Sequence, residues 1–172
     1  MPETPHAERL YLECQPRVVR YLTRLVGHAD TARDLAQETF LHAARSPLPE
    51  SEPGQRAWVF RIARNLGLNH LRDTAQHARM APDLDGGTGP AQETTLLVRE
   101  ALAQLAPLDR DIFLLREAAG LSYAEIAEAC AVTEDAVRSR LQRARQALRV
   151  LLHGTLATER ARGVRFSGRN DE

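Results

Sequence analysis

The sequence predicts an all-α protein, in which two small helical domains are joined by a flexible linker and the second domain contains a helix-turn-helix. Three observations predict this fold class. Apolar residues recur at helical spacing through most of the 172 residues. Aromatic residues make up only 5% of the chain, and the β-branched runs that strands favour are scarce. Residues 79–93 contain three glycines, two prolines and no apolar periodicity, which is typical of a flexible connection.

The chain length allows one domain of ordinary size or two small ones. We expect a first helical domain at residues 6–78, the linker at 79–93, and a second helical domain at 94–153. The tail, residues 154–172, lacks amphipathic order, and we expect it to be mobile.

The first domain is expected to contain three helices. The first runs from about His6 to Val26, and Pro16 should break it because proline lacks the N–H that a helix needs. Asp30 is the expected N-cap of the second helix, residues 31–45. The apolar faces of these helices are formed by Leu10, Cys14, Val18, Leu22 and Leu25 in the first, and by Ala32, Leu35, Ala36, Thr39, Phe40 and Ala43 in the second.

Residues 46–55 contain three prolines and are predicted to form a loop. A loop of this length exceeds what neighbouring helices need, which indicates a functional role. The third helix is expected from Arg56 to about His77. Its apolar side would be formed by Val59, Ile62, Ala63 and Leu66, with Phe60 and Leu71 partly buried.

Two polar surfaces stand out on these helices. Asp34, Gln37 and Glu38 form an outward strip with Leu41 on the second helix, which is either a solvated face or a contact for a protein partner. A separate stripe on the third helix carries one aromatic ring, two guanidinium groups and two amides: Trp58, Arg61, Asn65, Asn69 and Arg72. This set suits single-stranded nucleic acid, because a ring stacks on a base, amides read base edges and arginines hold phosphates. The alternative places Trp58 in the core and the amides in ordinary packing.

The second domain is expected to have helices at residues 95–106 and 107–119, followed by the helix-turn-helix. Ser122 and Glu125 predict a capping box at the start of its first helix. The turn is expected at residues 131–133, with Thr133 capping the second helix. Ala131 would be mildly strained if this turn requires a positive φ.

The second helix of this motif has one apolar stripe, formed by Val137, Leu141, Ala144 and Leu148. Between residues 138 and 149 there are five arginines and no acidic residue. A charged run is usually a solvated face, but here the cap, the turn spacing and the single sign of charge occur together. The segment therefore predicts a recognition helix for the major groove.

Composition excludes several other classes. The net charge is zero, and the two cysteines, Cys14 and Cys130, form neither a disulfide framework nor a metal-binding spacing. All 23 basic residues are arginine, whose forked guanidinium suits phosphates and base edges. There is no signal peptide and no run of membrane length. We expect a cytoplasmic protein without a cofactor, a metal, a membrane insertion or a small-molecule substrate.

With both halves in view, the chain resembles bacterial RNA polymerase sigma factors of the sigma-70 family, in the extracytoplasmic-function (ECF) group. Residues 34–40 are similar to the family's second conserved region, and residues 56–72 to its promoter-melting helix. Residues 121–127 and 137–145 are similar to the fourth region. The chain departs from the family pattern at Asn69, where Asp is usual, at Ala131, where Gly is common, and at Asp135-Ala136, which replace a frequent Gly-Thr.

The resemblance implies a sigma factor that binds core RNA polymerase, directs it to −35 and −10 promoter elements and promotes strand opening, in a stress or envelope response. It implies an anti-sigma partner, a proline-rich loop that helps to capture an extruded base, and a linker in the RNA-exit path. The implied sites are Asp34, Gln37 and Glu38 for core polymerase; Trp58, Arg61, Asn65, Asn69 and Arg72 for single-stranded −10 DNA; Arg138, Ser139, Gln142 and Arg143 for the −35 major groove; and Arg140, Arg145 and Arg149 for phosphates.

Three competing functions make different predictions. A free-standing helix-turn-helix regulator would bind intact duplex without polymerase, and it leaves the Trp58 stripe and the acidic strip unexplained. A polymerase adaptor that uses only the first half leaves the basic recognition helix unexplained. An enzyme is disfavoured, because neither a metal-binding motif nor a nucleophile elbow accompanies the six histidines.

Overall fold

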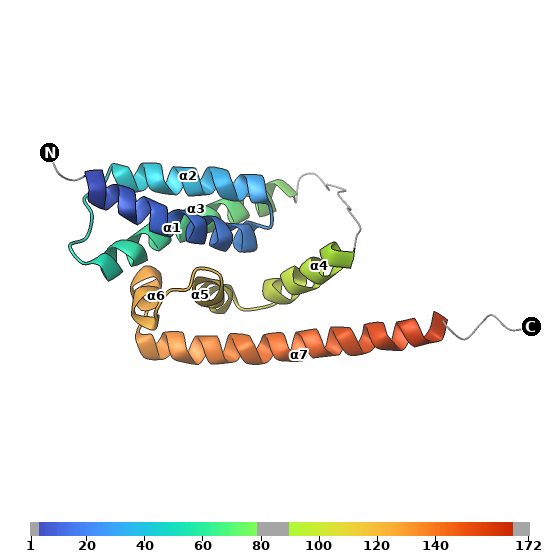
Figure 1. Cartoon of the computed structure of the whole chain (residues 1–172). Helices are drawn as coiled ribbons and strands as arrows, with labels where there is room; N and C mark the ends of the chain where they lie inside the picture. Colours follow the sequence, from blue (N-terminus) through green and yellow to red (C-terminus); the bar gives the residue numbers. More distant parts are fainter. Residues whose placement is uncertain (1–3, 79–89, 167–172) are drawn as a thin grey trace, which may run out of the picture.

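The structure is a computed structural model that describes the backbone of residues 4–78 and 90–166, with side chains for residues 8–76 and 96–154. The described residues form helices and short connections without any strand, which confirms the all-α prediction. In Figure 1, α1, α2 and α3 form one layer, and α7 runs along the opposite edge with α5 and α6 between them.

The first layer begins with α1, Thr4–Val26. All five residues predicted for its apolar face are buried. The predicted break at Pro16 is wrong, because α1 continues through this residue. Proline removes one hydrogen bond from the helix, but burial of Cys14 and Val18 on either side of it holds both halves of α1 against the same core.

The second helix, α2, spans Ala29–Ala44, and its predicted inward residues are buried or partly buried. The N-cap prediction is wrong: His28 occupies the cap position without a side-chain hydrogen bond, and Asp30 lies in the first turn. Asp30 instead pairs with Arg33 at 2.7 Å. A carboxylate in the first turn still stabilises the helix, because it faces the positive end of the helix dipole.

The third helix, α3, spans Glu52–Ala78 and begins earlier than predicted. Pro53 lies in its first turn, where a missing N–H is not needed. The loop therefore ends before residue 52 rather than at 55. Gly67 lies where α3 approaches α1 most closely, since a Cβ atom there would be 2.6 Å from Leu25 Cδ2.

The second half contains α4 (Pro90–Ala103), α5 (Pro107–Glu117), α6 (Tyr123–Cys130) and α7 (Glu134–Phe166). The capping box of α6 is confirmed, because Ser122 and Glu125 each accept the other's backbone N–H. The Thr133 hydroxyl accepts from the N–H of Ala136 and caps α7. Ala131 has φ of 54°, so the turn does require the left-handed conformation that the sequence analysis considered.

The ends of this half differ from the sequence prediction. Helix α4 starts at Pro90, so residues 90–93 of the expected linker are helical, while residues 79–89 lie outside the described residues. Helix α7 passes through Gly154 and continues to Phe166, whereas a mobile tail was expected from residue 154. One glycine costs a helix only about 1 kcal/mol, and the good helix formers Leu156, Ala157 and Glu159 follow it. Residues 167–172 lie outside the described part.

The two halves pack against each other, α3 on α6 and α1 on α5. Four arginines of the first half cross this contact. Arg56 pairs with Glu125 at 2.6 Å and Arg64 pairs with Asp111 at 3.0 Å. Arg17 donates to the carbonyls of Ala119 and Gly120, and Arg61 donates to that of Glu128. The two halves are therefore in direct contact, although a linker separates them in sequence.

Candidate protein and nucleic-acid interfaces

The predicted strip on α2 lies on the surface. Asp34, Gln37 and Glu38 are all exposed, and Glu38 makes one weak contact with the imidazole of His42 at 3.8 Å. Leu41 is 50% exposed and lies among them on the helix. A large apolar side chain within a polar surface is typical of a protein interface.

An aromatic pair lies beside this strip. Tyr11 of α1 packs edge-on against Phe40 of α2, with ring centroids 4.7 Å apart. Tyr11 remains exposed, and so does its neighbour Leu12. The outer surface of α1 and α2 therefore combines exposed apolar groups with polar and acidic ones, a combination that is common in protein interfaces.

The predicted stripe on α3 divides into two parts. Arg61, Asn65, Asn69 and Arg72 are exposed, but Trp58 is half-buried and packs against the hydrophobic core. Part of the indole therefore belongs to the core, whereas the two amides lie on the surface and not in the packing that the alternative expected. Binding of nucleic acid by this stripe stays a prediction.

Two members of the stripe are positioned by hydrogen bonds. Arg72 donates to the Asn69 side-chain oxygen at 2.5 Å, which orients this amide. Arg61 donates to the backbone carbonyl of Glu128 on α6 at 3.0 Å. Arg61 is thus engaged by the second half of the chain in this arrangement.

The predicted recognition helix, α7, buries its predicted apolar stripe completely or nearly so. Arg138, Ser139, Gln142 and Arg143 are all exposed on the remaining surface. Arg138 pairs with Asp135 at 2.6 Å, and its guanidinium carbon lies 5.7 Å from the centre of the Tyr123 ring. All four side chains are therefore accessible from solvent, and their contact with the −35 element stays a prediction.

The three arginines predicted to contact phosphates have partners within the chain. Arg145 pairs with Glu117 at 2.8 Å, and Arg149 donates to Gln146 at 3.2 Å. Arg140 pairs with Asp109 at 2.8 Å, and its side chain is only 31% exposed. Arg140 therefore faces α5, in contrast to the more exposed Arg145.

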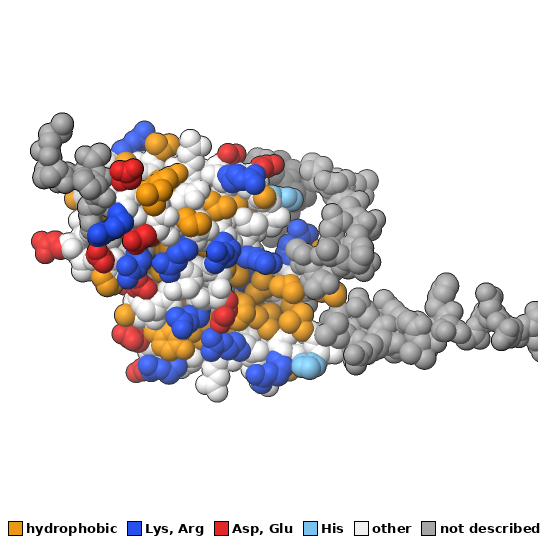
Figure 2. Space-filling model, in the orientation of Figure 1, with side chains coloured by type: hydrophobic (Ala, Val, Ile, Leu, Met, Phe, Trp, Pro, Cys, Tyr) orange, Lys and Arg blue, Asp and Glu red, His pale blue; other side chains and the backbone are white. Residues whose placement is uncertain are grey.

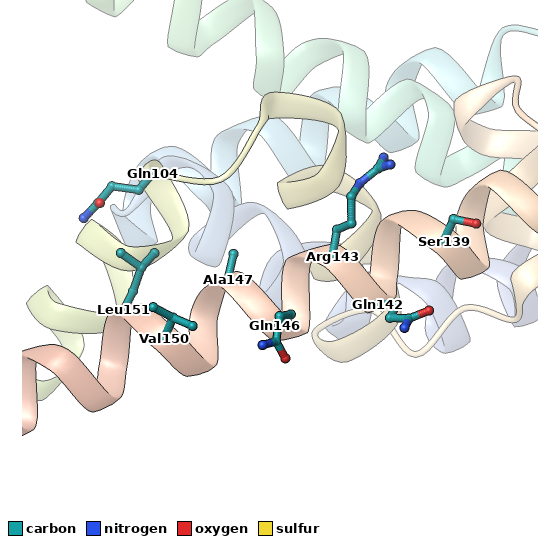
Figure 3. A pocket seen from close by; sticks show the side chains of 8 residues that line it. All are labelled: Gln104, Ser139, Gln142, Arg143, Gln146, Ala147, Val150 and Leu151. Atoms are coloured by element: carbon teal, nitrogen blue, oxygen red, sulfur yellow. The ribbon is translucent and has the colours of Figure 1, made fainter.

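A groove of about 800 Å³ runs along α7 beside the end of α4 (Figure 3). In this view Arg143 extends from α7 toward α5, whereas Gln142 and Gln146 project from the other side of the helix. The groove is lined by Gln104, Ser139, Gln142, Arg143, Gln146, Ala147, Val150 and Leu151. Three of the four predicted −35 contacts thus border a surface that combines polar and apolar groups.

Sequence reasoning missed the buried carboxylates that pair with Arg140, Arg64 and Arg56. These carboxylates are Asp109, Asp111 and Glu125, respectively, and a buried carboxylate requires a cation or several hydrogen bonds. Burial raises the pKa of Asp111, and Arg64 offsets this only in part. For Glu125, burial raises the pKa, but hydrogen bonds from Ser122 and Arg56 outweigh it and leave the pKa below its ordinary value.

Neither cysteine has the environment of a reactive thiol. Burial raises the pKa of both Cys14 and Cys130 to about 11, so each keeps its proton at neutral pH. Among the described side chains, no three histidine, cysteine or carboxylate groups converge as metal ligands would. Within the same part of the chain, none of the helices has the length and apolarity needed to cross a membrane.

Cationic side chains occur in two parts of the face shown in Figure 2, near the middle of the molecule and along its lower edge. Arg17, Arg56 and Arg64 are used in packing between the halves. Arg138 and Arg143 are exposed on α7.

Comparison with known proteins gives two family matches that follow the division into halves. Residues 10–77 match sigma-70 region 2, and residues 95–148 match sigma-70 region 4. The ECF RNA polymerase sigma factor SigL of Mycobacterium tuberculosis is 34% identical over 154 residues, covering 83% of this chain and 86% of SigL. The RNA polymerase sigma factor CarQ of Myxococcus xanthus is 36% identical over 169 residues, covering 90% and 93%.

Two solved structures superimpose on most of this chain. The sigma factor RpoE of Bartonella quintana, in complex with the anti-sigma factor NepR, superimposes with a TM-score of 0.66 at 25% identity, covering 85% of this chain and 96% of RpoE. CnrH, in complex with the cytosolic domain of CnrY, superimposes with a TM-score of 0.69 at 22% identity, covering 89% and 91%, and supports the fold alone. With both regions in order and relatives matched over most of their length, the chain belongs to the ECF group of the sigma-70 family of RNA polymerase sigma factors.

Proposed function

We propose that this protein binds core RNA polymerase, directs it to promoters that carry −35 and −10 elements, and promotes opening of the DNA strands. The observation that carries the proposal is the presence, in one chain, of three different exposed surfaces. These are the α2 strip, the amide-rich stripe of α3 and the polar face of α7. Their chemistry suits three different targets: a protein, single-stranded DNA and duplex DNA.

The α2 strip suits core polymerase. Asp34 and Glu38 give it a net negative charge, Gln37 adds a neutral amide, and Leu41 supplies an apolar centre that a partner can bury. Charge complementarity would guide assembly, while burial of the leucine would supply affinity. Tyr11 extends this surface onto α1.

The α3 stripe suits the opened strand of the −10 element. Asn65 and Asn69 present amides that can pair with base edges, and Arg72 holds Asn69 in place. The exposed edge of Trp58 offers a stacking surface. Arg61 would become available to DNA once its bond to α6 is released.

The face of α7 suits duplex DNA at the −35 element, with Arg138, Ser139, Gln142 and Arg143 directed at base edges. Arg145 and Arg149 would exchange their surface partners for phosphates. Such exposed pairs cost little to break, since each is worth about 0–1 kcal/mol. Arg140, which faces the buried Asp109, is the least suited of the three to contact a phosphate.

An anti-sigma partner follows from the same relationship, since RpoE of Bartonella quintana was solved in complex with the anti-sigma factor NepR. We also infer that the protein is cytoplasmic and non-catalytic, because the targets of a sigma factor are polymerase and chromosomal DNA.

Run-off transcription tests the proposal directly. Core polymerase with this protein should produce discrete transcripts from a subset of a promoter library, and core polymerase alone should not. Tight binding to intact duplex without polymerase, combined with no transcript, would instead support a free-standing regulator.

A charge-reversal variant tests the polymerase contact. Glu38→Arg should weaken assembly with core polymerase, because it inverts the charge of the α2 strip. Glu100→Arg is a suitable control, since Glu100 is also exposed but lies on α4 in the other half. Equal affinity of the two variants for core polymerase would remove the docking surface from the proposal.

A further inference from the structure

One carboxylate at the start of α5 binds two arginines of the recognition helix. Asp109 lies in the first turn of α5. Its Oδ1 accepts from Arg140 Nη1 at 2.8 Å, and its two oxygens accept from Arg143 Nε and Nη2 at 3.3 and 3.5 Å. Asp109 is only 7% exposed, so the group that holds both arginines is part of the domain core and not a mobile surface acid.

Burial makes this arrangement different from the other ion pairs on α7. Arg138 and Arg145 pair with carboxylates that are substantially exposed to solvent, and such pairs are weak and easily exchanged. Asp109 is held by the helix N-terminus and by its surroundings, so its two arginines have a fixed point of attachment. Burial alone raises the pKa of Asp109, but hydrogen bonds from Arg140 and Arg143 lower it below its ordinary value, so the group is ionised at neutral pH.

The two arginines are held in different ways. Arg140 is mostly covered and serves as the inner partner of Asp109, whereas the Arg143 side chain is 60% exposed. Arg143 uses its Nε–Nη2 edge for Asp109. The other edge of the guanidinium, formed by Nη1 and the second hydrogen of Nη2, remains available, and this edge can pair with O6 and N7 of a guanine.

Arg143 lies at the edge of the surface that we propose to face DNA. It lines the groove in Figure 3 together with Ser139 and Gln142, although Gln142 projects from the other side of α7. A flexible arginine loses about 0.5–1.5 kcal/mol of side-chain freedom when it is immobilised at an interface. Asp109 restricts Arg143 before DNA arrives, so less of this cost falls on promoter recognition.

We propose that Asp109 is a positioning residue for promoter specificity: it holds Arg143, with Arg140 as the inner support, in the orientation that reads a base pair of the upstream element. Asp109 does not itself contact DNA, and its negative charge opposes binding to phosphates in general. It therefore sharpens selectivity while it lowers non-specific affinity. This inference rests on the proposed function.

The test compares Asp109→Asn with wild type as holoenzyme, on a promoter that this protein uses and on the same promoter with single base-pair substitutions in the upstream element. The amide keeps the shape of the side chain but loses its charge. Discrimination between the intact and substituted elements should fall about 2- to 12-fold, which corresponds to the cost of ordering one side chain. Affinity for unrelated DNA should rise, because one negative charge near the phosphates is removed.

A double-variant cycle separates positioning from a purely structural role. Asp109→Asn should cost little further discrimination once Arg143→Ala is present, because the side chain to be positioned is gone. Glu117→Gln is the matched control, since it removes a carboxylate from another arginine of the same helix, Arg145, and should leave discrimination unchanged. Chemical denaturation of each variant reports any loss of folded protein.

The possible failures are distinguishable. A wild-type holoenzyme that does not discriminate among upstream elements would contradict the proposed function itself. If wild type discriminates, three results would overturn the positioning role and leave the sigma-factor function intact. The first is unchanged discrimination in Asp109→Asn, and the second is a parallel loss of its specific and non-specific affinity. The third is an effect of Asp109→Asn that adds to that of Arg143→Ala.

Discussion

Replacement of Ala131 by glycine should stabilise the protein, although glycine usually weakens helical proteins. Ala131 ends α6 with φ of 54° and ψ of 47°, in the left-handed region. An L-residue in this conformation costs roughly 1–2 kcal/mol relative to glycine, because its Cβ approaches the following carbonyl oxygen. Part of this gain is offset, because glycine increases the conformational entropy of the unfolded chain, which lowers stability by about 0.4–1 kcal/mol. The net expectation is a gain of about 0.5–1 kcal/mol.

Urea denaturation followed by circular dichroism measures this gain as a higher transition midpoint with an unchanged slope. In a thermal scan, about 1 kcal/mol corresponds to roughly 2–4 °C for a chain of this size. Ala124→Gly is the control, because Ala124 is exposed within α6 itself, and it should lose about 1 kcal/mol. The reasoning is refuted if Ala131→Gly lowers the midpoint, since the left-handed residue would then carry no strain that glycine relieves.

Three further outcomes are expected. Arg64→Ala should destabilise the protein by about 2–4 kcal/mol in urea denaturation, because it leaves the 1% exposed Asp111 without its cation; Arg64→Met combined with Asp111→Leu should recover most of the loss. The lowered pKa of Glu125 contributes stability that is present above its ordinary value of 4.5 and is lost as pH falls below it. The free energy of unfolding of Glu125→Gln should therefore fall less steeply with decreasing pH than that of wild type. Parallel plots of this free energy against pH for the two proteins would contradict the prediction. Asn65→Ala should reduce promoter opening by holoenzyme about 2- to 12-fold in permanganate footprinting while the closed complex forms normally.

The contact between the halves could not be predicted from the sequence, because its ion pairs join residues far apart in the chain. Arg56 and Glu125 are separated by 69 positions, and Arg64 and Asp111 by 47. Each arginine belongs to an acid-free helical segment that suited nucleic acid equally well. Only the packing of α3 on α6 shows that these cations face carboxylates of the same chain.

What the sequence by itself determined is the set of features that depend on neighbours three or four positions apart. The apolar stripes of α1 and α7 and the Ser122–Glu125 capping box belong to this set, because helix geometry places such neighbours side by side. The exposure of Asp34 and Glu38 follows from the same periodicity. Motif order, together with this pattern, was sufficient to indicate the ECF group.

Tertiary structure decided which charged groups face solvent and which face the chain itself. Arg140 and Arg143 have nearly the same sequence environment, yet one is covered by α5 and the other stays exposed. Their shared partner, Asp109, is 31 positions from Arg140, and periodicity carries no information on contacts at that separation. The physical reason is that the surrounding dielectric and the nearby charges decide whether an arginine pairs within the protein or remains available to DNA. Packing between helices sets both.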